Sequence, residues 1–426
     1  MKALKYIRRA ASGCRRPVWP RIDAGRQDTA RADAAGPRTF AADRNQRRGT
    51  GAPQAVGAGN LRKNLAVDTL THALSGALLA RALTPPAGAP SLRRTSALFG
   101  PPVPAGHAVA VGFLAAAFPD ADVVLKWVSD LAYMRGHRGV THSLLMLPLW
   151  ATLLGLVAAA AFRRLDAWRR YGWLAAGGIA IHIAGDWITQ FGTMLLAPLS
   201  DARFGLGSTF IIDLVVTGIV AGGLAASALL PRSRLPALAA LALLPVWVGV
   251  SVIARNEALG FGRAYAQQQG LAAARVDAAP RPASPFNWAV VVFDGRAYHV
   301  AHVNTRRAEP LHASPEDNFI RRYSAPYLPL HLARWERRAK FGDGSHEALA
   351  REVWQHPEFG FFRWFAMFPL VHAVEDGART CVWFRDLRFE FPGRSEVPFR
   401  YGMCRGAGSG WVRIAFEDIA GRSALR

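Results

Sequence analysis

Histidine and aspartate residues form four short clusters in the first half of the chain. They are Asp68 with His72, Asp120 with Asp122, His137 with His142, and His182 with Asp186. Each cluster lies at an end or on a face of an apolar segment, where such side chains are costly unless they have a function. Imidazole nitrogens and carboxylate oxygens are also ligands of catalytic divalent metals. The clusters therefore predict a metal-dependent hydrolytic site between membrane helices.

Two of the clusters have a spacing that suits one face of a helix. His182 and Asp186 are four residues apart, so a helix places both ligands on the same side. Asp68 and His72 have the same spacing. Here Asp68 is interpreted either as a helix cap or as a carboxylate that orients His72 and assists the chemistry.

The other two clusters lie where the chain is expected to turn. Residues 118–122 read FPDAD, in which a proline breaks a helix just before Asp120 and Asp122. Residues 137–143 read HRGVTHS, and the glycine allows a tight turn that directs both histidines to one point. We expect Arg138, inside this turn, to steady an anionic substrate such as a phosphate.

Each of these residues has an ordinary interpretation when it is taken alone, as a packing histidine, as a helix-capping aspartate or, for Asp186, as the partner of an ion pair with Arg138. Packing, however, requires a separate reason for every cluster. The metal candidates are His72, Asp120, Asp122, His137, His142, His182 and Asp186. Because none is a cysteine, the predicted cofactor is a divalent metal with an open position, zinc first, with manganese or iron as alternatives. The candidates are numerous enough for two metals, and a metal so held activates water for hydrolysis.

The net charge of +22 is distributed unevenly along the chain. Residues 1–66 contain 15 Lys or Arg and only 4 Asp or Glu, whereas the apolar residues concentrate between 70 and 255. This pattern indicates charged flanks and loops around membrane spans, and no nucleic-acid partner is expected. Of the three cysteines, Cys381 and Cys404 can pair if their domain faces an oxidising compartment, with two buried free thiols as the alternative.

Residues 1–66 are rich in Ala, Arg and Gly without sustained periodicity, so we expect a disordered basic leader. It lacks the apolar core of a secretory signal. A transit peptide is one alternative. The interpretation that we favour is a natural start at Val67, which would leave the leader untranslated.

Six apolar stretches follow, and they predict an all-α membrane bundle of about five to six helices over residues 67–256. They cover roughly residues 70–83, 106–128, 143–162, 172–199, 209–230 and 235–254. The first is short but contains several small residues, among them Ala73, Gly76 and Ala80, that suit close helix packing. A soluble all-α protein is the alternative.

Arginine placement predicts the topology of this bundle. Arg163, Arg164, Arg169 and Arg170 occupy the loop at 163–170, and other pairs precede the second stretch and follow the fifth. If these three loops are cytoplasmic, all four His/Asp clusters fall on the outer side of the membrane. We therefore expect one site assembled at that side.

The pattern changes after residue 256. Residues 257–284 are interpreted as a linker, and residues 285–426 as a soluble α+β or mostly β domain on the outer face. Phe286–Phe293, Asp294-Gly295 and Tyr298–Val303 predict a β-hairpin. Further strands are expected at 381–384, 388–391 and 410–416, and a short helix at 343–356.

The motifs DTLTHALSGALLA (68–80), FPDAD (118–122), HRGVTHS (137–143) and HIAGDWITQFGT (182–193) resemble the YdjM-like family of inner-membrane metal-dependent hydrolases. The resemblance covers about 68–255 and implies a multi-pass protein of the bacterial inner membrane, with the C-terminal domain on the periplasmic face. It also implies a polar role in catalysis for Asp213, for which a helix cap is the alternative. The HxxxD pair resembles the helical metal sites of zinc-dependent phospholipase C, which suggests phosphoester substrates.

Three functions are consistent with these observations. The first is a membrane hydrolase that acts on an ester or phosphoester, with a lipid or lipid-linked phosphoester best suited to a site at the bilayer surface. The second is a non-enzymatic membrane protein with a structural His/Asp metal site. The third is a transporter, which predicts ligands deep in the spans, whereas these clusters map to span ends.

Overall fold

The computed structural model describes residues 57–85, 98–271, 273–393 and 399–414. Most of the predicted disordered leader lies outside these residues. Its last part was predicted wrongly, because helix α2 (Gly57–Leu83) begins at Gly57 and includes residues 57–66. Leucine, lysine and alanine in this stretch favour helix, so the helix begins N-terminal to the apolar segment.

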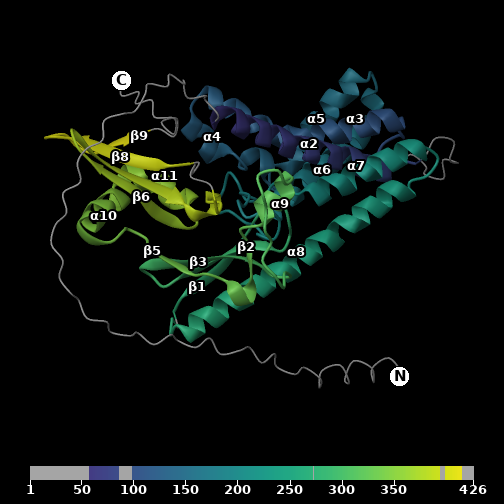
Figure 1. The fold of residues 1–426 in the computed structure, drawn as a ribbon. Coiled ribbons are helices and arrows are strands. Elements are labelled where there is room, and N and C mark those ends of the chain that lie inside the picture. The colour runs from purple at the N-terminus through teal and green to yellow at the C-terminus, as the bar shows by residue number, and fades with distance from the viewer. Residues whose placement is uncertain (1–56, 86–97, 272, 394–398, 415–426) are drawn as a thin grey trace, which may run out of the picture. The chain divides into compact units, whose positions relative to one another are not determined.

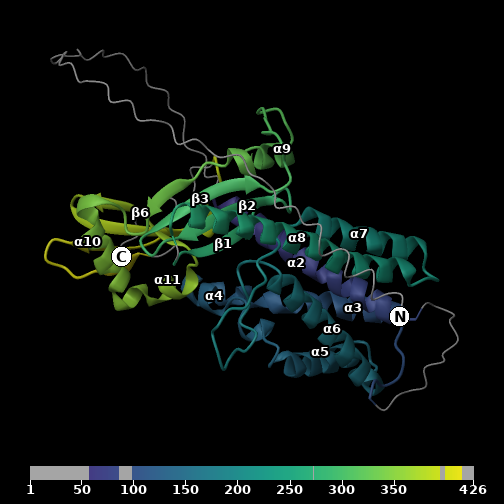
Figure 2. The ribbon, with the colours of Figure 1, turned by 90° about the horizontal axis from the view of Figure 1, so that it is seen from below.

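Each predicted apolar stretch contains a helix. Besides α2, they are α3 (Ala105–Ala117), α5 (Leu147–Ala161), α6 (Trp168–Trp187), α7 (Leu214–Leu229) and α8 (Leu235–Gln268). Shorter elements connect them: η1 (Phe118–Trp127), α4 (Asp130–Gly136), η2 (Val140–His142) and η3 (Leu165–Ala167). In Figures 1 and 2, α2 lies between the α7–α8 pair and the α3–α6 pair, and α5 packs on α6.

The helical region contains two to three candidate membrane spans. One candidate is residues 105–127, which comprise α3 and η1, and the other is the helix α8. Both are long and apolar enough to cross a bilayer. A third span results if residues 130–142 and 147–161, bent by 80°, count as one. The predicted five to six membrane helices are not confirmed, because α7 has only 16 residues and α6 contains Arg169, Arg170, His182 and Asp186.

Glycine and alanine bring α2 and α3 into close contact. A Cβ atom at Gly76 would lie 2.2 Å from the carbonyl oxygen of Gly112, and a Cβ at Gly112 would lie 2.4 Å from that of Gly76. Only glycine allows the two backbones to approach this closely. The expectation that small residues in the first apolar stretch serve helix packing is confirmed, and the contact fixes α2 beside the end of α3.

Residues 257–284 are not the linker that the sequence predicted. Helix α8 continues to Gln268, and strand β1 (Arg275–Pro280) follows almost at once. Small residues of this stretch face a sheet: Ala258 is buried, and a Cβ at Gly262 would lie 2.6 Å from Val276. The C-terminal half of α8 is therefore a support for the β domain (Figure 1).

The C-terminal region is a small α+β domain with two sheets. The first sheet orders β1-β2-β3-β4, with β5 also paired to β3, and the second orders β6-β7-β8-β9. The strands are β2 (Asn287–Phe293), β3 (Ala297–Asn304), β4 (Leu328–Pro329), β5 (Glu336–Ala339), β6 (Pro369–Asp376), β7 (Arg379–Asp386), β8 (Tyr401–Gly406) and β9 (Val412–Ile414). The short helices are α9 (Phe319–Ser324), η4 (Leu330–Leu332), η5 (Gly344–His346), α10 (Glu347–Gln355), η6 (Pro357–Phe359), α11 (Gly360–Phe365) and η7 (Leu387–Phe389).

The predicted hairpin is confirmed as β2 and β3, and the turn is fixed by Asp294, whose Oδ1 accepts the backbone N–H groups of Arg296 and Ala297. The helix expected at 343–356 is confirmed by α10. The strand expected at 388–391 is wrong: Asp386 accepts the N–H of Arg388 at 3.0 Å and begins the turn η7 instead.

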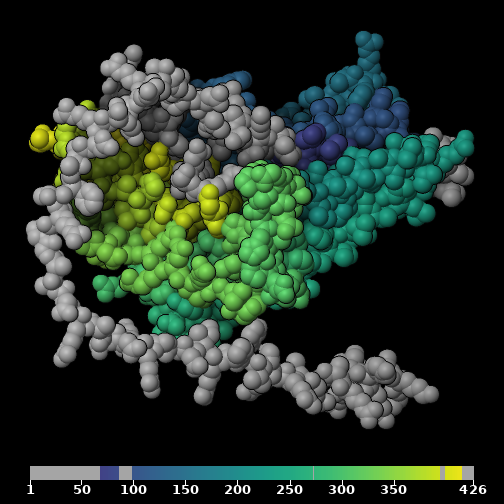
Figure 3. All heavy atoms as spheres, viewed as in Figure 1, coloured from purple at the N-terminus to yellow at the C-terminus, as the bar shows by residue number. Residues whose placement is uncertain are grey.

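The β domain is tied to the helical region at several points. Arg306 forms an ion pair with Glu257 of α8 at 2.7 Å, so the segment that leads to α9 lies against this helix (Figure 3). Tyr133 and Met134 of α4 belong to the aromatic core of the second sheet. In that sheet Cys381 of β7 lies opposite Cys404 of β8, and a disulfide joins them.

Candidate metal centre

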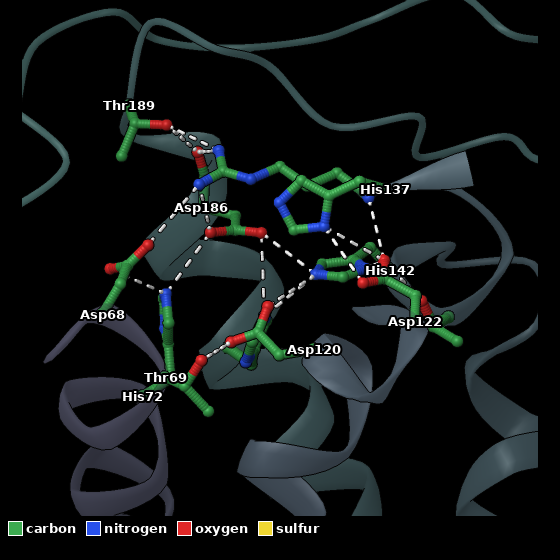
Figure 4. A network of polar contacts seen from close by, with 12 residues as sticks. Asp68, Thr69, His72, Asp120, Asp122, His137, His142, Asp186 and Thr189 are labelled. Atoms are coloured by element: carbon green, nitrogen blue, oxygen red, sulfur yellow. Dashed lines mark hydrogen bonds and ion pairs between the residues drawn. The ribbon is translucent and has the colours of Figure 1, made fainter. Parts of the chain in front are cut away.

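Four elements bring the predicted clusters together in one buried network (Figure 4). Helix α2 supplies Asp68 and His72, and η1 supplies Asp120 and Asp122. The turn after α4, together with η2, supplies His137, Arg138 and His142, and the end of α6 supplies His182 and Asp186. His142, His182 and Asp186 are at most 1% exposed.

The centre of the network is a pair of histidines whose Nε2 atoms lie 3.0 Å apart, His142 and His182. Nδ1 of His182 lies 2.6 Å from the carbonyl oxygen of Ala116, which only accepts, so this nitrogen bears the proton. In a neutral ring the Nε2 atom of His182 is then an unprotonated electron-pair donor. Nδ1 of His142 lies 3.7 Å from Asp122 and 3.0 Å from the hydroxyl of Thr141, contacts that favour the same tautomer.

Two carboxylates approach this pair. Asp120 Oδ1 lies 3.6 Å from Nε2 of both His142 and His182. Asp186 Oδ2 lies 3.2 Å from His142 and 3.6 Å from His182, and it is buried without a hydrogen-bond partner among the described residues. Four atoms that can donate electron pairs thus converge, and such a set fits a divalent metal.

A second group of ligand atoms shares part of this set. His72, His182 and Asp186 can hold a metal ion, as can Asp120, His142 and His182. Nε2 of His72 lies 3.3 Å from Asp186 Oδ1, and its ring stacks on that of His182 with 4.0 Å between centroids. Asp186 therefore faces both groups, one oxygen toward each.

Asp68 and Asp122 each contact a histidine of the network. Asp68 Oδ1 lies 3.5 Å from His72 Nε2. Because α2 begins at Gly57, Asp68 is inside the helix, and the helix-cap interpretation is wrong. Asp122 accepts from Nδ1 of His137 at 3.0 Å and from the backbone N–H of Arg138 at 3.2 Å. Neither Asp122 nor His137 belongs to the two groups that can hold a metal, and their geometry is that of supporting residues.

Arg138 forms its contacts with other residues of the network. Its Nη2 lies 2.9 Å from Asp186 Oδ1 and 3.8 Å from Asp68, and its Nη1 donates to the hydroxyl of Thr189 at 2.8 Å. The residue has a φ of 61°, a left-handed conformation that is uncommon for a side chain other than glycine. This turn places the guanidinium on Asp186 while the backbone N–H reaches Asp122. Arg138 thus forms an internal ion pair, and its contact with a substrate anion stays a prediction.

Asp213 lies apart from the network. It is the N-cap of α7, where Oδ1 accepts from the N–H groups of Val215 and Val216, and its Oδ2 accepts from Trp247 Nε1 at 3.0 Å. The helix-cap interpretation fits these contacts.

Two threonines of the network were not predicted. Thr69 donates to Asp120 Oδ2 at 2.7 Å, and Thr189 both accepts from Arg138 and donates to Asp186 O. Threonine is too common beside helix ends for the sequence to single them out.

A cavity of about 410 Å³ adjoins the network. Asp122 and Thr141 contribute to its wall, and Leu125, Val140 and Met194 make it largely apolar. It therefore offers space for a ligand with an apolar part beside the buried polar residues.

The fold and this site define a helical membrane protein with a His/Asp cluster that can hold a metal ion. Residues 67–258 match the family described as YdjM inner membrane protein, so the resemblance seen in the motifs is confirmed for this region. One relative, named "Uncharacterized protein YfhP", from Bacillus subtilis (strain 168), is 29% identical over 102 residues, which are 24% of this chain and 31% of that protein. The chain thus matches about a third of the length of this relative. No solved structure gives a significant match.

Proposed function

We propose that this protein is an integral-membrane, metal-dependent hydrolase whose substrate is an ester or phosphoester, with a lipid-linked phosphoester as the preferred candidate. The observation that carries the proposal is the convergence of His142 Nε2, His182 Nε2, Asp120 Oδ1 and Asp186 Oδ2. These residues would hold the metal, zinc first, with manganese or iron as alternatives. A divalent cation bound there would supply the Lewis acidity that hydrolysis requires.

The other residues have supporting tasks in this proposal. Asp122 holds the turn of His137 and orients His142. Arg138 neutralises part of the charge of Asp186. Asp68 contacts His72, and 19% of its side chain is exposed, so it can exchange a proton between the buried network and solvent. A role for Asp213 would have to be indirect, through the position of α7.

The proposed location is the bacterial inner membrane, with the site and the β domain on the periplasmic side. Three facts support it. The matched family is an inner-membrane family. The arginine-rich loop at 163–170 lies at the end of α6 opposite to His182 and Asp186. The disulfide between Cys381 and Cys404 is typical of a domain in an oxidising compartment.

A structural metal site without catalysis is the second candidate. The ion pair of Arg138 with Asp186 favours it, because one oxygen of a proposed ligand is already in use. The two candidates differ in turnover: a structural site confers stability and no hydrolysis.

The test is elemental analysis of the full chain purified in detergent, wild type against the double substitution His182→Ala with Asp186→Ala. We expect bound metal in the wild type only, together with hydrolysis of a generic phosphodiester or ester that chelator abolishes. Equal, negligible metal in both proteins would refute the proposal. Bound metal that raises the melting temperature, with no turnover on any ester class, would establish the structural alternative.

A further inference from the structure

Three arginines surround one aromatic ring next to the candidate metal centre. The guanidinium carbons of Arg138, Arg203 and Arg388 lie 5.2, 4.4 and 5.7 Å from the centroid of Phe191. These residues come from the site turn, the loop after α6, and the turn η7 of the β domain. The ring of His137 also lies 6.1 Å from that of Phe191, so this group of cations borders the site directly.

Two of the three cations have carboxylate partners and the third has none. Arg138 pairs with Asp186 at 2.9 Å, and Arg388 pairs with Asp386 at 2.8 Å. For Arg203 there is no ion pair within the described ranges of the chain. This difference singles out Arg203.

The guanidinium of Arg203 is enclosed between aromatic rings. It lies 4.4 Å from the centroid of Phe191 and 4.2 Å from that of Trp364. Nη2 donates a long hydrogen bond to the carbonyl oxygen of Met134 at 3.5 Å. Nε and Nη1 are buried, and no described residue accepts a hydrogen bond from either.

A buried arginine without a carboxylate partner lowers the stability of the folded protein unless it has a function. Burial, with the nearby charges of Arg388 and Arg138, lowers the pKa of Arg203 to about 9, and the carboxylate of Asp201 acts in the opposite direction. A buried cation without a partner is usually destabilising, and an apolar side chain of similar size is often more stable at such a position. Stacking on aromatic rings offsets part of this cost. An anion that accepts from Nε and Nη1 would remove the rest.

The cavity of about 410 Å³ is lined by residues close to Arg203 in the chain, but Arg203 itself is not among them. Its wall includes Ser200 and Asp201, just before Arg203, and Arg135 and Gly136, just after the Met134 carbonyl that Arg203 contacts. The same cavity touches Asp122 of the site. One space therefore adjoins the supports of the proposed metal ligands and the chain segment that precedes Arg203.

We infer that Arg203 is the anion-binding residue of a substrate subsite, and that its ligand is a phosphate group. Phosphate fits because planar N–H donors match its oxygens. As a substrate subsite it rests on the proposed hydrolase function; phosphate binding at Arg203 does not. The phosphate could belong to a lipid headgroup or to a soluble molecule, and both share this chemistry.

The experiment measures melting temperature of the full chain in detergent with chelator present, so that phosphate cannot bind through a metal. The variants are wild type, Arg203→Met and the control Arg351→Met, which removes an exposed arginine that also stacks on an aromatic ring. The probes are inorganic phosphate and a short-chain phosphatidic acid. Arg203→Lys serves as a second variant if Arg203→Met does not fold.

We expect both probes to raise the melting temperature of the wild type and of Arg351→Met. Arg203→Met should melt higher than the wild type without a probe and show no response to either, and Arg203→Lys should bind about tenfold more weakly or worse. A response to phosphatidic acid alone would assign the subsite to a lipid headgroup. If neither probe acts on the wild type, or if Arg203→Met melts lower and the response persists, Arg203 is a structural stacking residue and the inference is wrong. Hydrolysis is not measured here, so this result is separate from the test of the proposed function.

Discussion

His142 and His182 direct their Nε2 atoms at each other across 3.0 Å, although the two residues lie 40 positions apart in the chain. Hydrogen bonding at Nδ1 of His182 leaves its Nε2 unprotonated in the neutral ring, so the pair attracts a cation. Asp120 and Asp186 add negative charge at the same point. This relationship, more than any single residue, is why a metal fits the site.

The two aspartates of the FPDAD motif should differ in their effect on metal binding. Asp120 faces both Nε2 atoms, whereas Asp122 holds His137, the Arg138 backbone and the far side of His142. We expect Asp120→Asn to abolish metal retention and Asp122→Asn to weaken metal affinity about 10- to 100-fold, as for other outer hydrogen-bond partners of ligands. Competition with a chromophoric chelator measures both. The reverse order of effects would contradict this assignment.

Arg138 should matter most when the metal is absent. Removal of one partner of a buried ion pair usually costs about 3 to 5 kcal/mol, because the other charge remains buried alone. Arg138→Met therefore should lower the melting temperature strongly in chelator and less in saturating zinc, since the metal then compensates Asp186. Arg164→Met is the control, because its ion pair with Asp166 is on the surface. An equal loss with and without zinc would show that the ion pair and the metal do not share Asp186.

The sequence predicted the site better than the fold around it. Residue spacing and the ends of the apolar segments were enough to predict that Asp120, His142, His182 and Asp186 lie close together. Side chains at the same end of neighbouring helices are close in space. The ion pair of Arg138 with Asp186 was one of the alternatives that the sequence offered, and it is confirmed. The left-handed backbone that lets Arg138 also reach Asp122 was not predictable. The continuation of α8 to Gln268 was missed because alanine and glycine suggest a linker equally well. Only the sheet that packs on Gly262 decides between the two.

His302 should make the β domain less stable in mild acid. Burial, with Arg281 and Arg338 nearby, lowers its pKa from 6.5 to about 3. Below pH 6.5 the unfolded chain therefore binds a proton that the folded chain does not, and stability falls as the pH decreases toward 3, by about 1.4 kcal/mol per pH unit. His372, whose pKa is also lowered, acts in the same direction.

The measurement is the melting temperature between pH 4.5 and 7.5, above the range in which most carboxylates titrate. The substitution His302→Phe should flatten the profile, and the exposed His312→Phe should leave it unchanged. An unchanged slope in His302→Phe would mean that other groups carry the pH dependence.

The disulfide gives a test of the compartment. Cys381 and Cys404 should resist alkylation in intact cells until a reductant is added, when the experiment is done in a Cys14→Ser background. Loss of the bond through Cys381→Ser with Cys404→Ser should cost about 2 to 4 kcal/mol, and reductant should then have no further effect on the melting temperature. Free thiols in untreated cells would place the β domain in the cytoplasm and reverse the proposed topology.

A substitution at Gly185, which lies beside the ring of His72, tests whether His72 is needed for metal binding. A Cβ at Gly185 would lie 2.7 Å from Cε1 and 2.9 Å from Nδ1 of His72, so Gly185→Ala must displace this ring. Gly172→Ala is the control on the same helix, because its Cβ meets only the Ala151 carbonyl at an ordinary 3.6 Å. If a second metal lies between His72 and Asp186, Gly185→Ala should reduce the bound metal from two ions per chain to one. If only Asp120, His142, His182 and Asp186 hold metal, the content stays at one ion in both variants, and a complete loss in Gly185→Ala would instead make His72 part of a single shared site.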